Sequence, residues 1–347
     1  MQSENKTVWY DNLRVVATIA VIGIHVSSAY QPASRASISA YDFWVGNVFC
    51  SLSRFAVPVF VMLSGALLLS KDYKISVFLK KRLVRLLIPF IFWSFAYIAN
   101  SLINDFEAGS RPGFWEITRN IFVQLRDGSS GHFWYIYMII GLYLFIPIIG
   151  KWVRNATEKE LLYFLGIWGC VLILDQPVIS KIKPDIDLSY FSGFLGYLVL
   201  GHYLKIKSFG STCQTNTIAL ILIGLGLAST ILGTFLVHFY TNNYVSTFYE
   251  PLSPNILLYA MGLFILMKNK DISSLPAISI RNFISKYSYG IFLVHIMVLS
   301  KLDDFNIRWN FINSIIGIPI TVFTILIISA LIVFIVNKLP FGKYISG

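Results

Sequence analysis

Arg14 and His25 bring two ionisable side chains to the first long apolar stretch of the sequence. Eleven helical steps come within about 20° of three full turns, so the two would share one helical face, about 16 Å apart along the axis. Ionisable groups in a membrane helix are costly unless paired or hydrated, which marks them as candidates for function. A neutral imidazole could act as a general base there, and a guanidinium could bind an anion. We expect one inward-facing groove to touch both; the alternative for His25 is a structural hydrogen bond to a neighbouring helix.

Arg82 and Arg85 form a second candidate pair, at the start of another apolar stretch. Residues three apart are neighbours on one helical face. Guanidinium groups bind phosphates through paired hydrogen bonds and keep their charge. The pair therefore suits an anionic ligand such as a nucleotide or coenzyme A. The alternative is that both residues only fix the membrane topology and contact lipid headgroups.

Arg54 is embedded in an apolar segment with no acidic residue nearby in the sequence. We expect it inside a helix, where it must find a partner in space or line a hydrated cavity. Pro58 would disrupt the helical hydrogen bonds just beyond it, and Ser64-Gly65 would allow a close approach of helices. These residues predict a bent helix around a cavity. The alternative places Arg54 at the outer interface, with its charge reaching water.

Three weaker candidates are His132, Ser288 and His295. His132 precedes an apolar run at the expected outer edge, where aromatic belts are common anyway. Ser288 and His295 are seven residues apart, close to one helical face. We expect no carboxylate at the middle of an apolar run, and Asp11 is only at the inner end of the first. This distribution disfavours a simple proton pump.

The composition requires that lipid be the main surroundings of these residues. The chain of 347 residues is 56% hydrophobic and 13% charged, against roughly a quarter charged in soluble domains. We predict an all-α, polytopic transmembrane helical bundle of about ten helices, and a single membrane domain over residues 1–347. The three cysteines lack metal-ligand spacing, so we expect neither a disulfide nor a metal site. The ten apolar runs are 13–31, 44–69, 83–103, 133–150, 161–176, 190–204, 217–240, 252–267, 283–300 and 312–337.

The positive charges indicate an orientation. Of the 28 lysines and arginines, 19 fall before the first run or in alternate loops, eight fall on the opposite side, and Arg54 is left within a helix. Because positively charged loops tend to stay in the cytoplasm, we expect both termini there. The net charge of +11 then needs no nucleic acid to explain it. The stretch 104–132 would face outward and carry a short interfacial helix.

The ordered motifs resemble the acyltransferase-3 family of bacterial integral membrane acyltransferases. The arginine and histidine eleven residues apart and the second arginine pair are similar to two of its signatures, in the same order. Helices within 161–240 contribute little to the resemblance. The matching stretches are Trp9-Tyr10-Asp11-Asn12-Leu13-Arg14 with His25, Arg82-Leu83-Val84-Arg85, Ser53 to Phe60 with Ser64-Gly65, His132-Phe133-Trp134-Tyr135 and Ser288 to His295.

The resemblance implies O-acylation, usually O-acetylation, of a cell-surface polysaccharide or lipid-linked glycan in the bacterial plasma (inner) membrane. Acetyl-CoA or another acyl-CoA would be the cytoplasmic donor, with no bound cofactor. We expect no fused hydrolase-like domain, so the membrane domain would complete the transfer itself. His25 would be the general base and Arg14 would orient the donor, with direct transfer and a covalent acyl-enzyme both open. Arg82 and Arg85 would bind the donor phosphates, and the possible acceptor or oxyanion contacts are Arg54, His132, Ser288 and His295.

Two other functions remain open at this stage. A transporter or flippase of a lipid-linked saccharide also needs arginines in a membrane cavity, and it would move its substrate without consuming a thioester. A sensory or scaffold protein ranks last, because it leaves unexplained the alignment of Arg14 with His25 and the buried Arg54. Membrane lipids are the partners common to all three.

Overall fold

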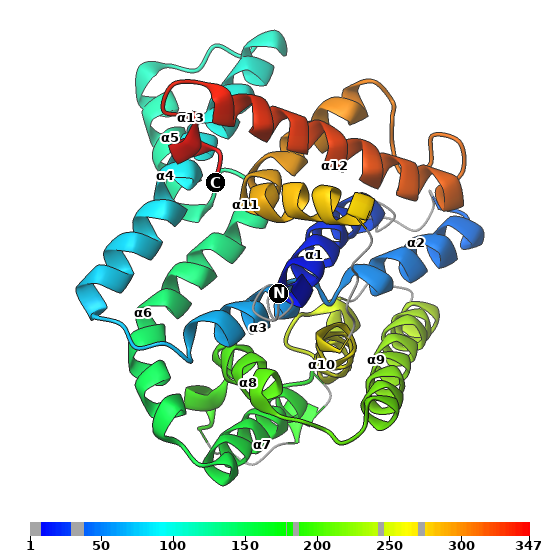
Figure 1. Cartoon of the computed structure of the whole chain (residues 1–347). Helices are drawn as coiled ribbons and strands as arrows, with labels where there is room; N and C mark the ends of the chain where they lie inside the picture. Colours follow the sequence, from blue (N-terminus) through cyan, green and yellow to red (C-terminus); the bar gives the residue numbers. More distant parts are fainter. Residues whose placement is uncertain (1–7, 29–37, 178, 183–186, 242–245, 270–274) are drawn as a thin grey trace.

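The computed structural model describes residues 8–28, 38–177, 179–182, 187–241, 246–269 and 275–347. These residues form helices and connecting segments without a β-strand (Figure 1). Each of the ten predicted apolar runs corresponds to helical structure, with the second run divided in two. The helices are α1 (Val8–Ser27), α2 (Ala40–Ser53), α3 (Ala56–Leu68), α4 (Ile75–Glu107), α5 (Phe114–Asp127), α6 (Trp134–Asn155), α7 (Glu158–Leu174), α8 (Leu195–Ile206), α9 (Thr212–Thr241), α10 (Pro254–Lys268), α11 (Leu275–Asp304), α12 (Ser314–Lys338) and α13 (Gly342–Ile345). Short 3-10 turns are η3 (Gly131–Phe133), η4 (Ile179–Lys181), η5 (Ser189–Phe191) and η6 (Thr247–Tyr249).

Seven helical segments in the described part of the chain are long and apolar enough to cross a membrane. They contain α2 with α3, α4, α6, α9, α10, α11 and α12. The predicted runs outside this set correspond to α1, α7 and α8. With 17 and 12 residues, α7 and α8 are shorter than the roughly 20 residues of a full span. The all-helical, polytopic architecture is therefore confirmed.

Helix α1 occupies the centre of the molecule. It contacts α2, α3, α10, α11 and α12, and Figure 1 shows these helices around it. Its small and branched residues Leu13, Ala17 and Ile22 are fully or almost fully buried. Because neighbours surround α1, its two basic residues Arg14 and His25 face protein and internal space.

The second apolar run breaks where Arg54 stands. Arg54 is the C-cap of α2 and Phe55 precedes the first residue of α3, so the expectation that Arg54 lies inside a continuous helix is wrong. Pro58 has no N–H to donate to the carbonyl group of Arg54, four residues earlier, which accounts for the interruption at this point. The two helices nevertheless belong to one segment long enough to cross a membrane, Ala40–Leu68, with Arg54 at the interruption.

Helices α3 and α8 cross closely through two glycines. A Cβ atom at Gly65 would lie 1.9 Å from the carbonyl oxygen of Leu198, and one at Gly201 would lie 2.0 Å from that of Met62. Only residues without a side chain allow the two backbones to approach this far. The predicted role of Gly65 in close helix approach is therefore confirmed, and the contact fixes α3 beside the cavities described below.

The outlying helix α5 lies within the polar stretch 104–132. None of its residues is buried, and it contacts α4. Its apolar residues Phe114, Trp115 and Phe122 are strongly exposed. This amphipathic surface helix matches the predicted interfacial segment.

Candidate functional site

Two internal cavities adjoin the central helix α1. We call the first, of about 480 Å³, the basic cavity, because its charged lining side chains are all cationic among the described residues. They are Arg14, Lys71, Arg82, Arg85 and Lys286. The second, of about 400 Å³, we call the histidine cavity, because His25 and His132 line it. Arg14 and His25 thus share α1 as predicted, but the expected single groove is divided into two compartments.

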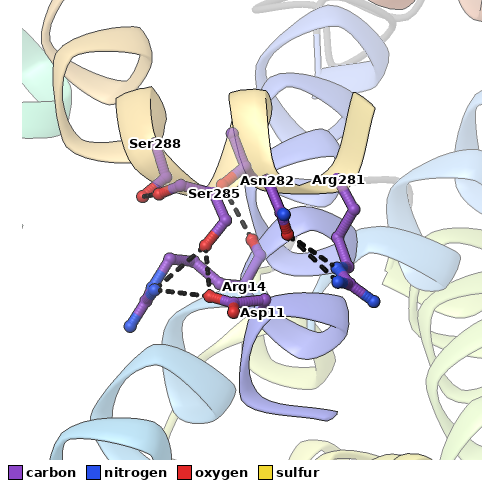
Figure 2. A network of polar contacts seen from close by, with 7 residues as sticks. Asp11, Arg14, Arg281, Asn282, Ser285 and Ser288 are labelled. Atoms are coloured by element: carbon purple, nitrogen blue, oxygen red, sulfur yellow. Dashed lines mark hydrogen bonds and ion pairs between the residues drawn. The ribbon is translucent and has the colours of Figure 1, made fainter. Parts of the chain in front are cut away.

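Arg14 is held by hydrogen bonds at the wall of the basic cavity. Its Nη1 atom donates to the Asp11 carboxylate at 3.1 Å and to the Ser285 hydroxyl oxygen at 3.0 Å. The Ser285 hydroxyl in turn donates to the same Asp11 oxygen at 2.6 Å. Figure 2 shows this triangle between α1 and α11. The carboxylate offsets part of the charge of Arg14 and restricts its orientation, so the guanidinium group is positioned before a ligand binds.

Arg82 and Arg85 extend the positive field of Arg14. Both stand on α4 and line the basic cavity. Lys71, which follows α3, and Lys286 of α11 line the same cavity. The structure therefore brings together the two arginine motifs that the sequence left 68 residues apart. Several cations around one cavity attract a ligand with several negative charges, and guanidinium groups match the geometry of phosphate oxygens.

Three imidazole rings meet beside the histidine cavity. The ring centres of His25 and His295 are 5.1 Å apart, those of His132 and His295 4.9 Å, and those of His25 and His132 6.1 Å. His25 is half-buried, whereas His132 and His295 are 3% and 1% exposed. His25 comes from α1, His132 from η3 and His295 from α11. The cluster therefore presents His25 and His132 to the cavity, while His295 packs against both rings without lining the cavity.

The hydrogen bonds of His295 define its proton arrangement. Its Nδ1 atom lies 2.7 Å from the carbonyl oxygen of Phe292, and a carbonyl oxygen only accepts, so a neutral ring carries its proton on Nδ1. Its buried Nε2 atom has no hydrogen-bond partner among the described residues. The Nδ1 atom of His132 lies 2.9 Å from the Ser130 hydroxyl oxygen. His295 thus offers an unprotonated nitrogen within the imidazole cluster.

Arg54 lines the histidine cavity and packs against Tyr249. Its guanidinium carbon lies 4.4 Å from the centre of the Tyr249 ring, a cation–π arrangement. The Nη2 atom donates to the Cys50 sulfur at 3.0 Å and to the Ser28 hydroxyl oxygen at 3.4 Å. Glu250 lines the same cavity. The prediction that Arg54 borders a cavity and finds partners in space is confirmed.

The predicted Ser288 and His295 lie on one helix but serve different surroundings. Ser288 lines the basic cavity and donates to the Ser285 carbonyl oxygen at 3.0 Å. His295 belongs to the imidazole cluster. Ser285 was not singled out from the sequence, and no sequence signal marks it because its partner Asp11 is 274 residues away. Asp11 itself, three residues before Arg14, had a local signal as a salt-bridge partner.

The chain is similar to known membrane acyltransferases. The profile of the acyltransferase domain of the acyltransferase-3 family matches residues 7–336. A Bacillus subtilis (strain 168) protein named as a membrane-bound acyltransferase, YfiQ, is 24% identical over 300 residues, which cover 82% of this chain and 78% of that protein. No solved structure matches the chain. The family match contains both arginine motifs and every residue that lines the two cavities except Gly347.

Proposed function

The chain belongs to the acyltransferase-3 family, and we propose that it transfers an acyl group, first of all acetyl, from acyl-CoA to a hydroxyl group of a cell-surface polysaccharide or lipid-linked glycan. A membrane acyltransferase must bring together a charged donor and an acceptor on the far side of a barrier. The observation that carries the proposal is the position of Arg14 and His25 on one helix but in two adjoining cavities. We place the protein in the bacterial inner membrane.

In this proposal the donor binds in the basic cavity from the cytoplasm. Coenzyme A carries several phosphate charges, which suit Arg82 and Arg85 together with Lys71 and Lys286. Arg14, fixed by Asp11 and Ser285, would orient the part of the donor nearest the thioester. The excess of positive charge in the loops at this end supports its cytoplasmic placement.

The acceptor hydroxyl would enter the histidine cavity. His25 removes its proton while the hydroxyl oxygen attacks the thioester carbonyl carbon. The carbon–sulfur bond breaks, the ester carbon–oxygen bond forms, and the coenzyme A thiolate leaves and takes up the proton. His132 and His295 orient His25 and spread its added charge, while Arg54 and Glu250 contact the acceptor. Arginine, carboxylate and the aromatic Trp134 at one cavity form a surface suited to a saccharide.

Free thiol release from acetyl-CoA tests this proposal. The purified protein in detergent is mixed with acetyl-CoA and a panel of candidate glycans, and His25→Ala runs in parallel. We expect release that an acceptor raises and that the variant loses while keeping its folded elution profile. The proposal fails when the folded wild-type protein neither binds acetyl-CoA nor releases thiol with any acceptor. Movement of a lipid-linked saccharide between leaflets under those conditions would favour the transporter.

A further inference from the structure

Three aromatic side chains line both cavities at once: Phe60 of α3, Tyr135 of α6 and Phe292 of α11. The ring centres of Phe60 and Tyr135 are 6.3 Å apart, and those of Tyr135 and Phe292 are 5.3 Å apart. All three are half-buried, as expected of rings that present part of their surface to internal space. We call these three residues the ring layer, and it is the boundary between the basic and histidine cavities.

The ring layer separates groups that must act together. Arg14, Arg82 and Arg85 lie on one side of it, and His25 and Arg54 lie on the other. A donor held by its phosphates on the basic side therefore has to extend its thioester to the ring layer for the carbonyl carbon to reach His25. The side chains of the ring layer are apolar apart from the Tyr135 hydroxyl group. The ring layer therefore favours an acyl thioester over phosphates or water.

The rings are also fixed in position. They come from three different helices, and α3 is fixed in turn by the glycine crossing with α8. Phe292 packs further against His132 and His295, at ring-centre distances of 5.0 and 5.8 Å. Packed interiors resist added volume, because extra methylene groups force side chains from their preferred rotamers. A passage built from such rings discriminates by size.

We propose that the ring layer of Phe60, Tyr135 and Phe292 is the passage for the acyl thioester and sets the largest acyl group that the protein transfers. This inference rests on the proposed acyl-CoA donor. It assigns short acyl groups as the preferred substrates, with acetyl ahead of butyryl and hexanoyl. Phe60 is the residue to substitute. It packs against Tyr135 within the ring layer, whereas Phe292 also packs against the imidazole rings of His132 and His295.

The test compares acetyl-, butyryl- and hexanoyl-CoA with wild-type protein and Phe60→Ala, using thiol release with the acceptor that raises it most. We expect Phe60→Ala to increase kcat/KM for hexanoyl-CoA relative to acetyl-CoA by about tenfold or more, since single methylene groups already change such ratios by about 10- to 200-fold in fitted pockets. Phe60→Trp should shift the ratio in the opposite direction. Phe164→Ala is the matched control, because Phe164 is also a half-buried phenylalanine but packs against Trp152 and Phe191.

The outcomes separate the inference from the function beneath it. A wild-type protein that consumes no acyl-CoA overturns the proposed function and the passage with it. If wild-type protein and Phe60→Ala both consume acetyl-CoA and have the same ratio of kcat/KM for hexanoyl-CoA to acetyl-CoA, that result overturns the passage alone. An equal shift with Phe164→Ala does so too, because it would show general loosening. If Phe60→Ala does not fold, Phe60→Leu and Phe60→Trp decide by the same ratio.

Discussion

Arg14 shows how a single charged residue is prepared for binding. Its guanidinium group is partly exposed to the basic cavity, yet Asp11 and Ser285 already hold one of its nitrogen atoms. Fixing a long side chain before a ligand arrives reduces the entropy lost on binding. Because Ser285 comes from α11 and Asp11 from α1, the orientation of Arg14 depends on two helices remaining in contact. Ser285 and Asp11 thus position Arg14, and in the proposed mechanism they position it for the donor.

Replacing Ser285 by alanine tests this role. Arg14 and Asp11 each lose a hydrogen bond of about 1 kcal/mol, so we expect KM for acetyl-CoA to rise about three- to tenfold with kcat little changed. The measurement is steady-state thiol release. Ser329→Ala is the control, because Ser329 is a buried serine of α12 whose hydroxyl has no partner among the described residues. A fall in kcat at constant KM would show that Ser285 does not act through donor binding.

Arg82 carries a second residue-scale prediction. Arg82→Gln would remove the proposed charge-assisted phosphate contact, worth roughly 1.5–3 kcal/mol, so the affinity for coenzyme A should fall about ten- to hundredfold. The residual binding should also depend less on salt, because fewer charges remain to be screened. Calorimetry of coenzyme A binding at two salt concentrations measures both effects. The exposed Arg119 of α5 provides the control as Arg119→Gln, and an equal loss there would point to net charge alone.

At the scale of elements, the cavities depend on how closely helices approach. Gly65 and Gly201 have no side chain where α3 crosses α8, so the two helices lie with backbone against backbone. Phe60 stands on α3, and Lys71 follows its end. A displacement of α3 would therefore widen the ring layer and change the basic cavity together.

Gly65→Ala should destabilise the protein, because the new methyl group meets the backbone of Leu198 and overpacking typically costs about 1–3 kcal/mol. The measurement is the thermal unfolding midpoint in detergent. Gly166→Ala in α7 is the matched control: a Cβ atom there meets nothing within 4 Å, and alanine favours a helix by about 1 kcal/mol over glycine. Equal midpoints for Gly65→Ala and wild type would contradict the close crossing.

For the molecule as a whole, local properties were predictable from the sequence and tertiary ones were not. Apolar runs encode membrane helices through their own hydropathy, so helical structure covers most of each predicted run among the described residues. The shared face of Arg14 and His25 also follows from helical geometry alone. The break at Arg54 was within reach, since Pro58 marks the missing hydrogen bond. The single-groove expectation failed because the ring layer combines residues of three helices far apart in sequence.

The contact between Asp11 and Ser285 illustrates the same limit. Nothing in a serine on an apolar helix marks it as the partner of a carboxylate 274 residues earlier. The imidazole cluster is similar, because His25, His132 and His295 were each recognisable but their meeting was not. Family membership, shown by the match over residues 7–336, connects these parts to acyl transfer. In the proposed mechanism, the arrangement of the whole molecule then connects a donor side to an acceptor side.

The most direct test of that account separates donor from acceptor by the membrane. The protein is reconstituted into sealed vesicles with acetyl-CoA outside only and, inside only, the saccharide that most raises thiol release. Molecules whose basic cavity faces outward should produce acetylated saccharide inside, detected by mass spectrometry after lysis, and His25→Ala should produce none. Acetylation that occurs only when donor and acceptor share a compartment, or that persists in His25→Ala, would contradict transfer between the two cavities.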